Sequence, residues 1–155
     1  MILILAVGQR QPAWVNSAVI DYLNRIPENQ RPQLREIKAE PRVAGKTVNT
    51  LMRAEADRLL AAIPKDSAMI ALDERGEPFT THQFADFLNK LALKKSNITF
   101  LIGGPDGLDS NLRLKSDRIV KLSYMTLPHG LARLILAEQL YRIHALLRGH
   151  PYHRN

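Results

Sequence analysis

The strongest constraint on the fold of this chain is a regular alternation between short apolar runs and segments with helical spacing. The run at 2–7 is almost entirely apolar, as in a strand that is buried on both faces of a parallel sheet. Further strands are expected at 33–37, 68–73, 97–102 and 118–123, of which 68–73 and 97–102 are also mainly apolar. Because strands alternate with helices, we expect an α/β fold, a mostly parallel sheet with helices on both faces.

The intervening segments carry ordinary helix signals. Helices are expected at 14–26, at 50–63, from Thr80 or Thr81 to about 93, at 131–147, and briefly before 118. A long basic loop is expected at 40–49, a turn at 74–78 and a loop at 124–130. Since neither a repeat nor an inter-domain linker appears, we expect residues 1–155 to form a single domain.

Composition excludes several classes of protein. The 155 residues contain no cysteine, so disulfides, thiolate metal sites and cysteine nucleophiles are all excluded. No apolar run approaches the roughly 18 residues of a membrane span. The apolar start of the chain lacks the basic region of a signal peptide. We therefore expect a cytoplasmic protein without a membrane segment.

The charge balance points to a polyanionic partner. Lys and Arg outnumber Asp and Glu by 22 to 15, which leaves a formal net charge of +7. Nucleic acid is the commonest partner of such a basic domain. A basic surface that serves only solubility is the alternative.

Ligands of open α/β sheets bind beyond the carboxyl ends of the strands. Three loops leave such ends here, after Leu72, after 102 and after Leu122. The middle loop opens with Gly103 and Gly104, which would let a ligand lie against bare backbone. A simple tight turn explains the glycine pair equally well.

Familiar nucleotide and metal motifs are absent. The glycines at 103–107 do not match G-x-G-x-x-G, so a nicotinamide oxidoreductase is disfavoured. The stretch 44–47 (AGKT) resembles the end of a P-loop, but Glu40 stands where the first glycine belongs. The five histidines show no metal-ligand spacing, and we expect no metal site.

The last part of the chain carries candidate RNA-binding groups. The tail holds Arg148, His150, Tyr152, His153 and Arg154, whose cations can grip phosphates and whose rings can stack on a base. A frayed basic end is the alternative. The preceding helix is apolar on nearly every side, which favours either burial within the monomer or a homodimer interface.

Four motifs together resemble the RlmH family of bacterial large-subunit ribosomal RNA methyltransferases, in the SPOUT superfamily. They are 101–108 (LIGGPDGL), 122–129 (LSYMTLPH), 137–142 (AEQLYR) and 150–154 (HPYHR). The resemblance covers essentially the whole chain. It implies methylation of N3 of a pseudouridine in 23S rRNA, on the ribosome, by a homodimer. It also implies S-adenosyl-L-methionine held in a C-terminal trefoil knot.

The resemblance also assigns residues. The cofactor-binding positions that it implies are Leu72, Gly103, Leu122, Ser123, Tyr124, Met125, Thr126 and Leu127. They lie in the three loops already chosen on physical grounds.

Catalytic roles are a hypothesis that rests on the polar tail and on the resemblance together. We expect Tyr152, His153 and Arg154 to position and polarise the pseudouridine, with His129 and Arg142 as weaker candidates. Alternatives are a related SPOUT enzyme that acts on another RNA and a non-catalytic rRNA-binding factor.

Overall fold

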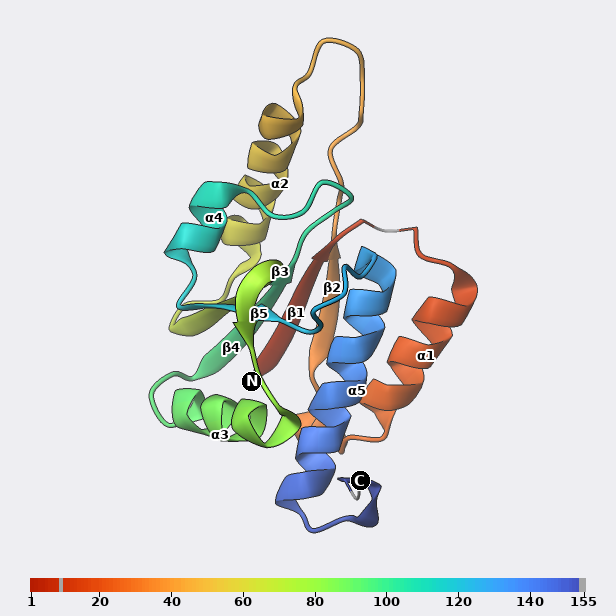
Figure 1. The fold of residues 1–155 in the computed structure, drawn as a ribbon, viewed down its shortest axis with the longest axis vertical. Coiled ribbons are helices and arrows are strands. Elements are labelled where there is room, and N and C mark those ends of the chain that lie inside the picture. The colour runs from red at the N-terminus through yellow and green to blue at the C-terminus, as the bar shows by residue number, and fades with distance from the viewer. Residues whose placement is uncertain (9, 154–155) are drawn as a thin grey trace.

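A computed structural model describes residues 1–8 and 10–153 (Figure 1). Five strands form one sheet in which every pairing is parallel, in the order β2-β1-β4-β3-β5. The strands are β1 (Ile2–Val7), β2 (Gln33–Ile37), β3 (Ser67–Pro78), β4 (Asn97–Ile102) and β5 (Arg118–Lys121). The parallel α/β architecture that the alternating pattern predicts is therefore confirmed.

Helices cover both faces of this sheet, which Figure 1 shows as three layers. The helices are α1 (Ala13–Asn24), η1 (Glu28–Gln30), α2 (Val48–Ala62), α3 (Thr81–Ala92), α4 (Ser110–Lys115), α5 (His129–Leu147) and η2 (Pro151–His153). Thr80 caps α3 with a capping box that includes Gln83, and this satisfies two otherwise free N–H groups. In the described residues no helix is long and apolar enough to cross a membrane.

Alternate residues of the strands build two separate cores. Ile4 and Phe100 face α3 and α5, whereas Leu3, Leu5 and Leu101 face α2 and α4. All of these side chains are buried. Because both faces are covered, the polar groups of the sheet collect at the ends of its strands.

The prediction of a turn at 74–78 is wrong. These residues continue β3, because Glu77 and Pro78 pair with β5 after an irregularity that begins at Leu72. Val120 is paired with both Leu72 and Glu77, so the intervening residues bulge out of the ladder. A Cβ on Gly76 would lie 2.5 Å from a backbone atom of Val120. The glycine that suggested a turn is thus required by a close approach of two strands.

Two element boundaries differ more modestly from expectation. Helix α5 begins at His129 and not at 131, so the loop expected at 124–130 is shorter. Strand β5 ends at Lys121 and not at 123. Proline sets the first of these boundaries, since Pro128 stands directly before α5, where its missing N–H costs no helical hydrogen bond.

We predict that Gly76→Ala destabilises the protein strongly. The added methyl group would overlap the backbone of Val120 and force β3 and β5 apart, at a cost of about 3 kcal/mol. Chemical denaturation of the two proteins measures this cost. Gly45→Ala is the matched control, because Gly45 has a positive φ but nothing within 4 Å of its Cβ position. Equal losses in the two variants would contradict the predicted overlap.

Candidate cofactor and RNA site

The three predicted cofactor loops meet at the carboxyl edge of the sheet. Leu72 pairs with Ile102 on one side and with Val120 on the other. Gly103 therefore follows β4 beside the bulge of β3, and Leu122 follows β5 on the other side of β3. The loop expected after Leu72 is this bulge within β3 and not a connection between two elements. The fold brings all eight predicted cofactor residues to one edge.

Gly103 lies where the loop 103–107, which we call the glycine loop, packs against itself. A Cβ at this position would lie 2.3 Å from the carbonyl carbon of Gly107. Gly107 has a φ of +85° and donates its N–H to the carbonyl of Gly104 at 3.0 Å. The tight turn thus accounts for these glycines by itself, and cofactor binding at Gly103 stays a prediction.

The segment 122–127 crosses from β5 to α5 over the same edge. Ser123 Oγ accepts the N–H of Met125 at 2.9 Å, and Thr126 donates its hydroxyl to Glu74 at 3.2 Å. The side chains of Tyr124 and Met125 are 82% and 78% exposed. Lys121 lies over the ring of Tyr124, 4.1 Å from its centroid. Two large hydrophobic side chains of this segment therefore stand in solvent.

The main chain of this segment makes few hydrogen bonds among the described residues. One hydrogen bond is described for the main chain of residues 124–127, the one from Met125 to Ser123. Binding of the cofactor by the remaining N–H and C=O groups of this segment stays a prediction. Two apolar residues, Leu122 and Leu127, are half-buried at either end of the segment. Apolar walls with a few polar backbone groups are typical of cofactor pockets.

His129 begins α5 and is half-buried next to this segment. Burial, together with the positive charge of Arg133, lowers the pKa of His129 below its usual value of 6.5. The imidazole is therefore neutral at pH 7, with a nitrogen able to accept a proton. Among the five predicted catalytic residues, His129 is the one that the described structure places at the cofactor edge.

Arg133 was missed by sequence reasoning. Its side chain is 1% exposed and donates to Glu36 and to the carbonyl of Val7, both at 2.8 Å. It also donates to the carbonyl of Gly8. The guanidinium thus caps the carboxyl end of β1, where carbonyls would otherwise lack donors. The sequence alone suggests that an arginine on this helix has an exposed side chain. Only the packing of α5 against the end of β1 shows that Arg133 is buried.

The tail candidates lie at the other end of α5. Arg142 donates to Glu138 at 2.9 and 2.6 Å and to the carbonyl of Tyr152 at 3.3 Å. The ring of Tyr152 packs against that of Tyr141, with centroids 4.6 Å apart. Arg142 therefore holds η2 against the helix, and its pair with Glu138 is the expected i,i+4 ion pair. Figure 1 shows η2 at the bottom, away from the loops after β4 and β5.

Burial raises the pKa of Tyr152, and a hydrogen bond with Tyr22 and the charge of Glu138 raise it further. The phenol therefore keeps its proton and acts as a donor, as it does toward Glu138 at 3.3 Å. The side chain of His153 and the whole of Arg154 lie outside the described residues. Their predicted roles stay predictions.

The described residues contain no group of three or more His, Asp or Glu side chains placed to hold a metal ion. Two acidic side chains lie next to the site. Glu74 accepts the hydroxyl of Thr126, and Asp73 accepts from Arg113 at 3.2 Å and so ties the bulge of β3 to α4.

We predict that the imidazole of His129 titrates below pH 6.5 in the folded protein. The lowered pKa means that the unfolded chain binds the proton more readily, so the stabilisation is complete above pH 6.5 and is lost as the pH falls. Proton NMR follows the titration, and urea unfolding between pH 7.5 and 5.5 follows the stability. His129→Gln should lose less stability over this range than the natural protein. An equal loss would show that His129 is not responsible.

Comparison with known proteins agrees with this arrangement. The family model described as "Predicted SPOUT methyltransferase" matches residues 1–153. The ribosomal RNA large subunit methyltransferase H of Bordetella petrii is 48% identical over 153 residues, which cover 99% of this chain and 98% of the relative. Those of Ralstonia pickettii and Burkholderia lata are 46% and 45% identical, with 98% and 97% of each relative covered. The resemblance carried by the four motifs is confirmed, and the chain belongs to the SPOUT methyltransferase family.

Proposed function

We propose that this chain is an S-adenosyl-L-methionine-dependent methyltransferase that methylates N3 of a pseudouridine in 23S rRNA. One observation carries the proposal: in a chain that matches the SPOUT family over 1–153, the three predicted cofactor loops meet at one edge of the sheet. The curated relatives are named as methyltransferases of large-subunit ribosomal RNA. The net charge of +7 favours an RNA substrate as well.

The reaction asks little of side-chain chemistry. The cofactor supplies an activated methyl group on a sulfonium. N3 forms a bond to the methyl carbon as the bond to sulfur breaks, and the N3 proton must leave. The protein therefore has to place the two reactants in line, exclude water and take up one proton.

We assign proton uptake to His129. It is neutral at pH 7 and begins α5 directly after the segment 122–128. Tyr152 keeps its proton, so its role is donation rather than proton uptake. We assign to it, with His153 and Arg154, the positioning of the uracil-like ring. Arg142 contributes by holding the main chain of Tyr152.

We infer that the working site needs two copies of the chain. The 19 residues of α5 span about 28 Å, and they separate His129 from η2. One chain thus cannot bring its tail and its cofactor loops to the same nucleotide. A two-fold dimer with the two α5 helices antiparallel would place the tail of one copy beside the loops of the other.

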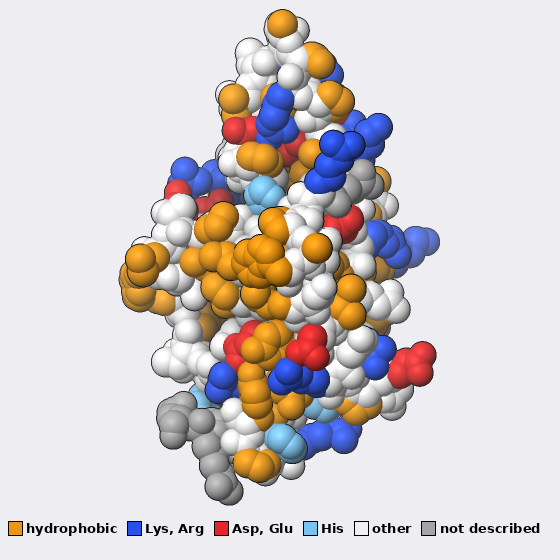
Figure 2. Space-filling model, turned by 90° about the vertical axis from the view of Figure 1, so that its right-hand side faces the viewer, with side chains coloured by type: hydrophobic (Ala, Val, Ile, Leu, Met, Phe, Trp, Pro, Cys, Tyr) orange, Lys and Arg blue, Asp and Glu red, His pale blue; other side chains and the backbone are white. Residues whose placement is uncertain are grey.

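The exposed hydrophobic side chains support this dimer. Figure 2 shows such side chains gathered across the middle of one face, over the side where α1 lies. Trp14 and Ile20 of α1 are exposed, as are Tyr124 and Met125. Within the chain α5 is already packed against α1 and α3, so burial within the monomer accounts for much of its apolar character. The face beside α5 is left for the second copy.

The remaining expectations belong to the same proposal. We propose that residues 1–155 act as one domain in the cytoplasm, where ribosomes are assembled and modified. We also propose that the path from β3 to α5 forms the trefoil knot that the family resemblance implies.

Methylation of ribosomes tests the function. Ribosomes from a strain that lacks the modification are mixed with the purified protein and radiolabelled S-adenosyl-L-methionine. We expect label at N3 of a 23S pseudouridine and none on free tRNA. Label on a different RNA would indicate a related SPOUT activity. A folded protein that binds rRNA but labels nothing would indicate a non-catalytic factor.

Mixed dimers test whether two copies share the site. One copy carries Thr126→Arg in the cofactor segment, and the other carries His153→Ala with Arg154→Ala in the tail. Each parent is expected to lack activity. Mixed dimers, purified through two different affinity tags, should recover about half of the natural activity because one of their two sites is intact. Mixed dimers as inactive as their parents would show that each site lies within one chain, and full activity of the tail variant would refute its assigned role.

A further inference from the structure

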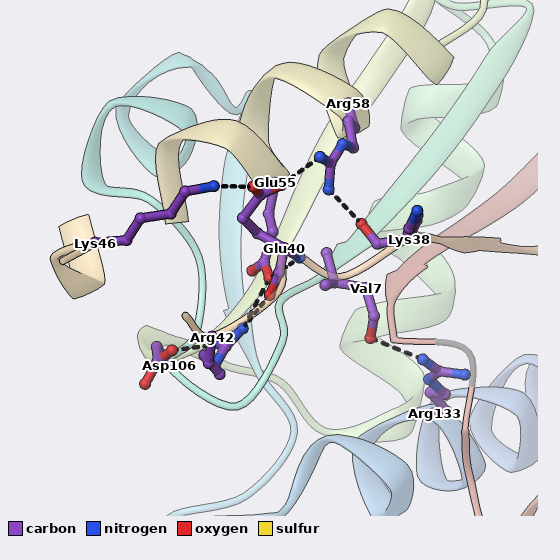
Figure 3. A network of polar contacts seen from close by, with 9 residues as sticks. All are labelled: Val7, Lys38, Glu40, Arg42, Lys46, Glu55, Arg58, Asp106 and Arg133. Atoms are coloured by element: carbon purple, nitrogen blue, oxygen red, sulfur yellow. Dashed lines mark hydrogen bonds and ion pairs between the residues drawn. The ribbon is translucent and has the colours of Figure 1, made fainter. Parts of the chain in front are cut away.

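A polar network joins the glycine loop to α2 and to the β2–α2 loop (Figure 3). Its centre is Glu55 of α2, which is among the few charged residues that are fully buried. A buried carboxylate is costly unless it is paired, so its contacts indicate which elements have to stay together.

Glu55 presents one oxygen to the β2–α2 loop and the other to the glycine loop. Oε1 accepts the N–H of Glu40 at 2.9 Å and a guanidinium nitrogen of Arg42 at 3.2 Å. Oε2 has no hydrogen-bond partner among the described residues. It lies 3.2 Å from the point where a Cβ on Gly104 would be. The carboxylate is therefore pressed against the glycine loop, and glycine at 104 permits this approach.

Arg42 completes the connection. The guanidinium that binds Glu55 also donates, through its other terminal nitrogen, to Asp106 of the glycine loop. This pair is the one side-chain hydrogen bond described for residues 103–107. Arg42 thus ties the glycine loop to a buried anchor on a neighbouring helix.

The same network argues against direct RNA binding by the β2–α2 loop. Lys46 pairs with Glu40 at 2.6 Å, and Arg58 pairs with the second oxygen of Glu40. Three carboxylates and three cations are present, so the cluster carries no net charge that would attract phosphates. Arg42 and Lys46, the basic side chains of the loop expected at 40–49, are both paired with carboxylates of the protein.

We propose that Arg42 is a positioning residue for the cofactor, and that it acts by holding the glycine loop against Glu55. This inference rests on the proposed function, in which Gly103 contacts S-adenosyl-L-methionine. The glycine loop contains three glycines and has much conformational freedom to lose when it binds a ligand. A loop that is already held in place binds more tightly, because less ordering remains at the moment of binding.

Two substitutions of opposite charge test the proposal. Arg42→Gln removes the cation of the pair and Asp106→Asn removes the carboxylate, so each variant breaks the same ion pair. Each should weaken binding of S-adenosyl-L-methionine to the purified full-length protein by about five- to tenfold, as measured by calorimetry. The KM for the cofactor should rise by the same factor, while kcat and the KM for ribosomes stay within about twofold.

An RNA contact by Arg42 would give a different pattern. Arg42→Gln would then weaken ribosome binding, whereas Asp106→Asn would strengthen it. Both variants would bind the cofactor as tightly as the natural protein. Lys46→Gln is the matched control, because it removes the same charge from the same loop but leaves the Arg42–Asp106 pair intact. It should bind the cofactor like the natural protein.

The outcomes separate this proposal from the proposed function. If the natural protein binds no S-adenosyl-L-methionine, the proposed function fails. If the natural protein binds it and the two variants bind it equally well, with unchanged thermal midpoints, the positioning role is refuted. Weaker cofactor binding by the Lys46→Gln control would also refute the positioning role. Cofactor affinity would then depend on the charge of the loop and not on the Arg42–Asp106 pair.

Discussion

The parallel pairing of five strands is the constraint on which the rest of this molecule depends. Because every strand points the same way, all five carboxyl ends meet at one edge of the sheet. Helices cover both faces, so this edge is where main-chain groups and charged side chains have to find partners. Arg133 caps the end of β1, Arg113 holds Asp73 in the bulge of β3, and Arg42 holds the glycine loop after β4. Arginine serves at all three places because one planar group carries several donors.

Sequence patterns predicted the framework of this structure better than its polar interior. The bounds of β1 and β4 agree with the apolar runs, because a strand buried on both faces has a composition unlike any other element. The stretch 74–78 was misjudged because its partner, Val120, comes much later in the chain. Glu55 and Arg133 could not be found, since a charged residue on a helix looks the same whether it faces water or a strand end. Loop positions could be predicted, whereas the contacts between loops could not.

The candidate site is divided along α5. At one end lie the glycine loop, the segment 122–127 and a neutral His129, and at the other end lies the tail that Arg142 fastens to the helix. A rigid helix of this length keeps the two halves apart more firmly than a flexible linker would. In the dimer that we propose, the tail of one copy would act on the cofactor loops of the other, close to the exposed Tyr124 and Met125.

The position of β1 inside the sheet, between β2 and β4, has a consequence for synthesis of the protein. β1 is flanked by β2, which follows it closely, and by β4, whose first pairings join Ile2 to Ile98. As the nascent chain leaves the ribosome, β1 can therefore gain one neighbour early, but its second edge stays open until most of the chain has been made. That edge is hydrophobic and unpaired, the kind of surface that recruits chaperones or aggregates. Slow elongation before residue 98 would lengthen this vulnerable interval, whereas slow elongation after β4 would not.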